Sequence, residues 1–430
     1  MKNCVVAITN LMGVVSLWAA PVVSSSEISQ ETGNRAVTVS YVLGGGPGIV
    51  TMDIQTNTLS DASGEWVSIG VENLSCVVGD MFKYVSTTGK KTASWRPDKA
   101  WPGRFAEKGT IRAVVTAWPT NTPPDYMAVP LDGESSFRYF AKGVPGGATN
   151  REYKTKYLLM RKVPVAGVTW KMGSAEDGPD KKYRAAGNEL QHAVSISEDF
   201  YLSVFETTLA QHVAVGNNVN TAKQFAFGDG SDNEIMPVNG CSYASVRGSD
   251  YLYTSTTPSY AGHNVSPSCF IQKFRNKTGV PFDLPSEAEW EYACRAGVGT
   301  PMYVPDADYS EATARRIAWC GQNSSQGCSA MQPHPVGGLE ANQWGFYDML
   351  GNVAEWVLDP STGNSYYSTE EAKLNPHAPV PSSITMIYRG HYYATDWMHM
   401  RASAKGDQWR SYDNAQYGYR LWAPAFVNWE

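Results

Sequence analysis

Residues 342–356 read NQWGFYDMLGNVAEW, a stretch in which two carboxylates flank a tight turn. Asp348 and Glu355 are the two acids, and Gly351 lies between them. Glycine tolerates sharp backbone turns, so carbonyl oxygens of such a turn can approach both carboxylates. Oxygen ligands of this kind suit calcium. The alternative is a turn or helix in which Asp348 caps backbone amides and Glu355 is solvated.

Further upstream, residues 284–293 read LPSEAEWEYA and predict a well-capped helix. Ser286 is a natural N-cap, and Glu289 three residues later completes a capping box. Trp290 marks the inward face of this helix. Glu291 and Arg295 are spaced to pair at i, i+4, and we expect them on the outward face. This helix carries no chemistry of its own.

Five shorter motifs accompany these two stretches along the chain. They are Met172-Gly173-Ser174, Phe205-Glu206-Thr207-Thr208, Pro335-Val336-Gly337, Tyr388-Arg389-Gly390 and Gly418-Tyr419-Arg420. In order and spacing the seven segments resemble the formylglycine-generating enzyme (sulfatase-modifying factor) family, over about residues 160–425. The resemblance implies an α+β, C-type-lectin-like domain with long ordered loops, which we place at residues 155–430.

The resemblance also implies a calcium site. In the family, positions matching Asp348 and Glu355 bind calcium through side chains, and those matching Gly351 and Val353 bind it through carbonyl oxygens. A second calcium site of the family needs acidic or amide ligands in the loop before Pro335-Val336-Gly337. That loop has no carboxylate here, so the second site is not expected.

The catalytic positions of the family are altered in this chain. Active members bind Cu(I) through two thiolates five residues apart, and thiolates suit a soft metal. Thr395 and Met400 stand at those two positions, and Tyr392 replaces the family's serine. Ala354 replaces a tryptophan. A hydroxyl and a thioether cannot supply paired thiolates, so we expect neither bound copper nor the family's oxidation of a sulfatase cysteine.

Two hypotheses about function follow from these differences. The first is a non-catalytic protein that binds a protein, peptide or carbohydrate ligand on an aromatic face, although about half of these side chains are also expected in the core. The face comprises Tyr392, Tyr393, Trp397, His399, Trp409, Tyr412 and Tyr417. The second hypothesis is an active oxidase with displaced ligands. Iron-dependent chemistry, as in the sulfoxide-synthase branch, is disfavoured because its His-x-x-x-His motif is absent.

The cysteines bear on both hypotheses. Cys320 and Cys328 bracket a Gly/Ser/Asn-rich loop that can bring them within disulfide range, so we predict a disulfide between them. The same two thiols are the candidates for displaced copper ligands. Cys294 lies beside the apolar face of the predicted helix and is expected to pack as a small hydrophobic residue.

The N-terminal third is expected to begin with an export signal and to be rich in strands. Residues 1–25 resemble a secretory signal, with Lys2, an apolar run and a cleavage point near Ser24 or Ser25, which predicts a secreted or periplasmic protein. Residues 27–35 are polar and expected to be loose. Alternating strands from Ala36 onwards predict an all-β, sandwich-like domain over residues 31–150, read as a structural or docking module.

Overall charge and hydropathy exclude two further classes. The chain of 430 residues has a formal net charge of −6, which provides no basic surface for nucleic acid. After the N-terminal segment no stretch is apolar and long enough to span a bilayer, so no transmembrane segment is expected in the mature chain.

Overall fold

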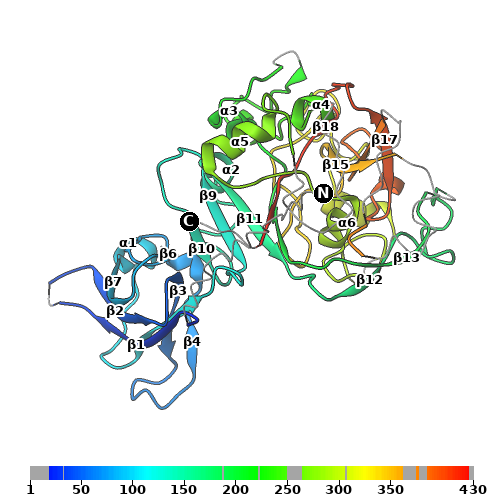
Figure 1. Cartoon of the computed structure of the whole chain (residues 1–430). Coiled ribbons are helices and arrows are strands. Elements are labelled where there is room, and N and C mark those ends of the chain that lie inside the picture. The colour runs from blue at the N-terminus through cyan, green and yellow to red at the C-terminus, as the bar shows by residue number, and fades with distance from the viewer. Residues whose placement is uncertain are drawn as a thin grey trace, which may run out of the picture.

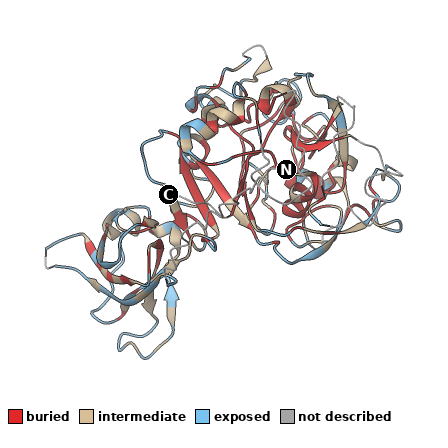
Figure 2. Ribbon diagram, in the orientation of Figure 1, coloured by how far each residue is buried: buried red, intermediate tan, exposed pale blue. Residues whose placement is uncertain are grey.

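The computed structural model describes most of the chain (Figure 1). The described ranges are residues 19–31, 33–185, 188–220, 223–248, 264–305, 308–361, 374–376 and 385–425. Their buried positions concentrate in the interior of the larger C-terminal part and between the strands of the N-terminal part (Figure 2). No helix in the described ranges is long and apolar enough to cross a membrane.

Two antiparallel sheets make up the N-terminal part. One has the order β1-β2-β7-β5, and in the other β3 pairs with β4, β6 and β8. Their strands are β1 (Val22–Ser29), β2 (Val37–Gly44), β3 (Gly48–Asn57), β4 (Trp66–Ser68), β5 (Val77–Gly79), β6 (Lys83–Val85), β7 (Gly89–Trp95) and β8 (Ile111–Trp118). Along β2, Val39, Tyr41 and Leu43 are buried and alternate with less buried residues, as the sequence pattern predicts. These side chains share one core cluster with Val50 and Ile54 of β3.

The first strand corrects one expectation and bears on another. β1 pairs with β2 from Val22 opposite Gly44 to Ser29 opposite Thr38. Residues 27–29 are therefore ordered in a sheet and not loose as expected, because antiparallel pairing with β2 satisfies their backbone hydrogen-bonding groups. The basic and apolar regions of the predicted signal lie in residues 1–18, outside the described residues. The predicted cleavage point lies within β1.

A five-stranded sheet joins the two parts of the chain. Its order is β10-β9-β11-β14-β19, all antiparallel. The strands are β9 (Tyr126–Pro130), β10 (Arg138–Phe140), β11 (Tyr157–Val163), β14 (Phe200–Ser203) and β19 (Trp422–Pro424). The boundary expected near residue 155 therefore falls inside a sheet. The sequence missed this because pairing between β9 and β11 spans a long polar connection and leaves no local signal.

Short helices and two small sheets complete the two parts of the chain. β12 (Thr169–Met172) pairs with β13 (His192–Ser195), and the order β17-β16-β15-β18 forms the other sheet. Its strands are β15 (Ala354–Pro360), β16 (Thr385–Arg389), β17 (Lys405–Trp409) and β18 (Tyr417–Gly418). The helices are α1 (Pro97–Ala100), α2 (Glu152–Thr155), α3 (Leu209–Ala214), α4 (Tyr243–Val246), α5 (Phe270–Thr278), α6 (Glu287–Arg295) and α7 (Glu311–Ile317), with short 3₁₀ turns η1 (Val71–Asn73), η3 (Asn233–Ile235) and η6 (Trp397–His399).

Helix α6 confirms the predicted capping box and corrects its outer face. The Ser286 hydroxyl accepts a hydrogen bond from the Glu289 amide, and the Glu289 carboxylate accepts one from the Ser286 amide. Glu291 and Arg295 pair at 2.7 Å as predicted, but both are buried. The reason is Arg389 of β16, which ion-pairs with Glu291 and turns the expected outer face into an interior one.

Candidate functional site

The turn before β15 has an unusual backbone. Asp348 and Asn352 have positive φ of 54° and 57°, and Gly351 between them has φ of 78°. A Cβ atom on Gly351 would lie 2.2 Å from the carbonyl oxygen of Trp319, so only glycine fits there. Left-handed backbone at non-glycine residues is strained and is held by surrounding contacts. The sequence motif therefore encodes a fixed turn that aims Asp348 inward.

Three buried carboxylates meet behind this turn: Glu206, Asp348 and Glu355. Glu206 accepts hydrogen bonds from the Val353 amide at 3.0 Å and the Asn352 side chain at 2.6 Å. Burial raises the pKa of Asp348 to about 6, and the charge of Glu355 adds to the effect. Burial, with the charges of Asp348 and Glu355, also raises the pKa of Glu206 well above its ordinary value. Buried like charges of this kind favour a compensating cation.

Arginine and lysine side chains provide part of that compensation. Arg420 binds the Glu355 carboxylate with an Nη2–Oε1 distance of 2.9 Å, and Trp290 donates its indole N–H to the same carboxylate at 2.7 Å. Lys154 lies near Asp348 and donates to the Val336 carbonyl oxygen at 2.7 Å. The sequence motifs contained Glu206 and Arg420, but only the fold shows that they face Glu355.

The predicted calcium ligands therefore fit the ion only in part. Asp348 accepts a backbone hydrogen bond from the Gly337 amide at 2.6 Å through one of its two carboxylate oxygens, and burial raises its pKa. Glu355, in contrast, already has Arg420 and Trp290 as partners. Within the described ranges no group of three or more His, Cys, Asp or Glu side chains is arranged to hold a metal ion. Calcium at Asp348, Gly351, Val353 and Glu355 stays a prediction.

The positions of the expected catalytic thiolates follow β16. Gly390 and His391 have positive φ of 81° and 58°, which turns the chain sharply after Arg389. The Thr395 hydroxyl oxygen is buried and has no hydrogen-bond partner among the described residues, whereas the Thr395 carbonyl oxygen accepts from the Gly321 amide at 2.8 Å. Met400 is fully buried in the core cluster that also contains Cys320. Neither side chain offers a thiolate or a free ligand position.

The predicted disulfide between Cys320 and Cys328 is not formed. Both are free thiols, and Cys320 is buried while Cys328 is partly exposed. Cys320 instead packs in the core, with its sulfur 3.5 Å from the Gln322 side-chain oxygen. Burial raises the pKa of the Cys320 thiol, so the protonated form is favoured at neutral pH. The backbone hydrogen bond between Gly321 and Thr395 nevertheless places Cys320 beside the segment that contains Thr395.

The predicted aromatic face divides into buried and exposed members. Tyr393 and Tyr417 are buried, and Tyr392 packs against the core. Trp409, at the end of β17, and Tyr412, on the β17–β18 connection, are 53% and 42% exposed. Rigid, exposed aromatic rings are a common feature of ligand-contacting surfaces. Of the predicted face, these two side chains are the most accessible to a ligand.

The 3₁₀ turn η6 carries the remaining members of the predicted face. Trp397 lies half-buried against Tyr183 and Tyr309, with ring centroids 6.0 and 5.3 Å away. The ring of His399 is 5.4 Å from that of His391, and burial, with the nearby charges of His399 and two arginines, lowers the pKa of His391 to about 3. Trp397 is thus mainly a packing residue. The proximity of His391 and His399 was not expected from the sequence.

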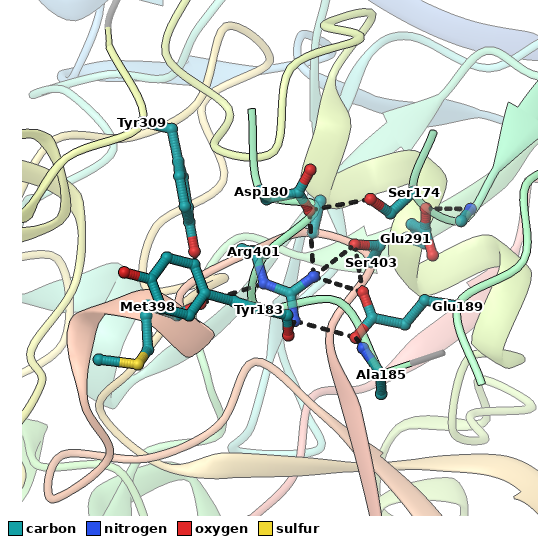
Figure 3. A network of polar contacts seen from close by, with 12 residues as sticks. Ser174, Asp180, Tyr183, Ala185, Glu189, Glu291, Tyr309, Met398, Arg401 and Ser403 are labelled. Atoms are coloured by element: carbon teal, nitrogen blue, oxygen red, sulfur yellow. Dashed lines mark hydrogen bonds and ion pairs between the residues drawn. The ribbon is translucent and has the colours of Figure 1, made fainter. Parts of the chain in front are cut away.

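A buried ion-pair network joins Arg401, just after η6, to Asp180 and Glu189 (Figure 3). The Arg401 guanidinium pairs with Asp180 at 3.1 Å and with Glu189, and donates to the Tyr183 carbonyl oxygen at 3.0 Å. The Tyr309 hydroxyl donates to the Met398 carbonyl oxygen at 2.5 Å. Fully paired buried charges hold a defined geometry, because breaking one partner leaves the other charge unsatisfied. The segment that contains Met398 and Arg401 is therefore held in a defined position.

Known proteins were compared with the whole chain. Residues 149–424 match the sulfatase-modifying factor enzyme 1-like domain. The formylglycine-generating enzyme of Mus musculus is 25% identical over 264 residues, covering 54% of this chain and 66% of that enzyme. The formylglycine-generating enzyme of Mycobacterium tuberculosis is 29% identical over 173 residues, covering 37% of this chain and 57% of that enzyme.

Among solved structures, PvdO from Pseudomonas aeruginosa aligns with a TM-score of 0.47 and 20% identity, covering 62% of this chain and 95% of that chain. The chain spans just under two thirds of the length of the mouse formylglycine-generating enzyme and less of the mycobacterial one. The matched region covers well over half of the chain and contains all seven motifs. The chain belongs to the family of sulfatase-modifying factor enzyme 1-like, or formylglycine-generating enzyme-like, proteins.

Proposed function

We propose that this protein is a non-catalytic member of its family that binds a ligand through the exposed aromatic surface on the β17–β18 connection. One observation carries the proposal: Met400 is fully buried in the core, and the sequence resemblance matches Met400 and Thr395 to the copper-binding thiolates of the family. The family's reaction requires a soft metal held by two thiolates. A buried thioether and a hydroxyl cannot replace them.

The alternative is an oxidase in which Cys320 and Cys328 act as displaced ligands. Cys320 supports it by its position beside Thr395. Two features weigh against it. Burial raises the pKa of both thiols, even though Cys328 is partly exposed. Cys320 is also packed inside a core cluster. A thiol that stays protonated is a poor nucleophile and a poor metal ligand.

A peptide assay separates the two. The purified protein, loaded with copper and supplied with oxygen, is incubated with a sulfatase-motif cysteine peptide, and the product is read by mass spectrometry. An active family member serves as positive control. We expect no formylglycine. Conversion that is lost in Cys320→Ser or Cys328→Ser would establish the displaced-ligand oxidase and refute the non-catalytic proposal.

Export and the finer description of the fold belong to the same proposal. A secreted or periplasmic location is supported by the apolar segment near the N-terminus. A β-sandwich before the family domain is supported by the two N-terminal sheets with a shared core, and the C-type-lectin-like description of the family domain rests on the sequence resemblance. N-terminal sequencing of the protein from its native cell tests export, since retention of Met1 on a cytosolic protein would contradict it.

A further inference from the structure

A recess beside the exposed tyrosine has the features of a small-molecule site. It has a volume of about 320 Å³ and lies between residues 223–225 and residues 412–415, the second of which belong to the connection between β17 and β18. Sites for small ligands begin at about 300 Å³. The recess therefore accommodates one compact ring rather than an extended chain.

Two aromatic side chains line the recess, and both are held in place. The Phe225 ring meets the Tyr393 ring edge-on at 5.6 Å, and the Tyr412 ring meets the Tyr417 ring edge-on at 6.0 Å. The Tyr412 hydroxyl accepts a hydrogen bond from the Asn414 side chain at 3.0 Å. Rings fixed in this way lose little conformational entropy when a ligand stacks on them.

Charge is balanced at the recess. Lys223 and Asp413, which both line it, form an ion pair with an Nζ–Oδ1 distance of 2.8 Å. Lys223 also donates to the Asp413 carbonyl oxygen. The two charges compensate each other, so the lining attracts neither anions nor cations strongly. A neutral ligand suits this lining better than an acidic or basic one.

Two amide side chains, those of Gln224 and Asn414, also line the recess, and hydrogen bonds tie Gln224 to the neighbouring Asn239. The Gln224 side chain donates to the Asn239 carbonyl oxygen at 2.7 Å, and the Asn239 side chain donates to the Ala415 carbonyl oxygen at 3.0 Å. Asn239 is 2% exposed and is not one of the residues that line the recess, so the amide side chains that a ligand meets are those of Gln224 and Asn414.

We infer that this recess binds one ring of a neutral carbohydrate, an inference that rests on the proposed binding function. A sugar ring has an apolar C–H face and a rim of hydroxyl groups. The C–H face matches the rings of Tyr412 and Phe225. The hydroxyl groups match the side chains of Gln224 and Asn414, which offer both donors and acceptors. Balanced charge and a volume near 320 Å³ complete the match.

Titration with neutral oligosaccharides tests the inference. The full chain is examined by saturation-transfer NMR and calorimetry with gluco-, manno-, galacto- and N-acetylglucosamine oligosaccharides. We expect at least one to bind, and Tyr412→Ala to weaken that binding at least tenfold. Tyr412→Phe keeps the ring and should weaken it less. Phe105→Ala removes another fully exposed aromatic ring, far along the chain in the N-terminal part, and should leave the affinity unchanged.

The outcomes separate this inference from the proposed function. If no oligosaccharide binds, or if Tyr412→Ala binds as well as Phe105→Ala does, the carbohydrate assignment is wrong and the non-catalytic proposal stands. Binding of a peptide that depends on Tyr412, without any sugar binding, has the same meaning. Formylglycine formation in the peptide assay would instead remove the non-catalytic proposal, whatever the result with sugars.

Discussion

Several buried charged residues in this protein form ion pairs with partners that are distant in sequence. Glu355 and Arg420 lie 65 positions apart in the sequence, in two different motifs, and form a fully buried ion pair. Glu291 was expected to face solvent but lies between Arg295 and Arg389. Residue types and local spacing identified these side chains as notable. Their partners could not be identified, because ion pairing across a core depends on the complete fold.

The clearest prediction at this scale concerns calcium and Asp348. Excess calcium should stabilise the folded protein by about 2.7 kcal/mol at a hundredfold excess over Kd, because ligand binds only the native state. Asp348→Ala should abolish this gain, whereas Glu340→Ala, an exposed acid paired with Arg316, should keep it. Thermal unfolding with calcium and with chelator measures both. Identical melting temperatures at neutral pH would contradict a calcium site.

The same carboxylate gives the calcium effect a pH dependence. The folded-state pKa of Asp348 is raised to about 6 from its ordinary value of 3.8, so without calcium its contribution to stability is lost as the pH rises through this window. Below pH 6 the proton competes with calcium for the carboxylate. The calcium-induced rise in melting temperature should therefore shrink as the pH falls from 7 to 5. A rise that is constant over this range would exclude Asp348 as a ligand.

At the scale of elements, local sequence signals correctly predicted a helix cap and a strand face. The capping box of α6 and the inward alternation of β2 are properties of contiguous residues, and both are confirmed. Pairing between β9 and β11, and the strand β1, were missed because they depend on long-range partners. The aromatic face shows the same limit: Trp409 ends β17 and Tyr417 begins β18, and their local sequence gives no signal that separates the exposed ring from the buried one.

The helix cap provides the prediction at this scale. Ser286→Ala removes the hydroxyl that accepts from the Glu289 amide and should lower the free energy of unfolding by about 1 kcal/mol. Ser329→Ala, at an exposed serine in the loop after Cys328, should change it little. Urea denaturation monitored by circular dichroism compares the two variants. Equal stability of both would mean that the cap contributes nothing measurable.

At the scale of the whole molecule, the five-stranded sheet binds the N-terminal and C-terminal parts together (Figure 1). The family match begins at residue 149, yet β9, which ends at Pro130, pairs along β11 over five residue positions from Tyr157 to Arg161. Met127 and Val129 of β9 are fully buried in the core cluster of the C-terminal part. The unit that packs as one body is therefore longer than the sequence motifs suggest.

Truncation tests this. A chain beginning at residue 120 keeps β9 and β10, whereas one beginning at residue 150 loses both and exposes the edge of β11. We expect the longer fragment to unfold cooperatively and the shorter one to aggregate or to melt at a clearly lower temperature, since an uncovered apolar edge strand invites association. Scanning calorimetry and size-exclusion chromatography compare them. A shorter fragment as stable as the longer would contradict the extended boundary.

The position of β19 has a consequence for how the protein folds in time. This strand, Trp422–Pro424, lies near the end of the chain and pairs with β14 more than two hundred positions earlier. The sheet therefore cannot be completed until Trp422–Pro424 has been synthesised. Pairings between such remote segments are slow to form. The N-terminal sheets can assemble first, whereas the five-stranded sheet stays incomplete and prone to aggregation until β19 pairs with β14.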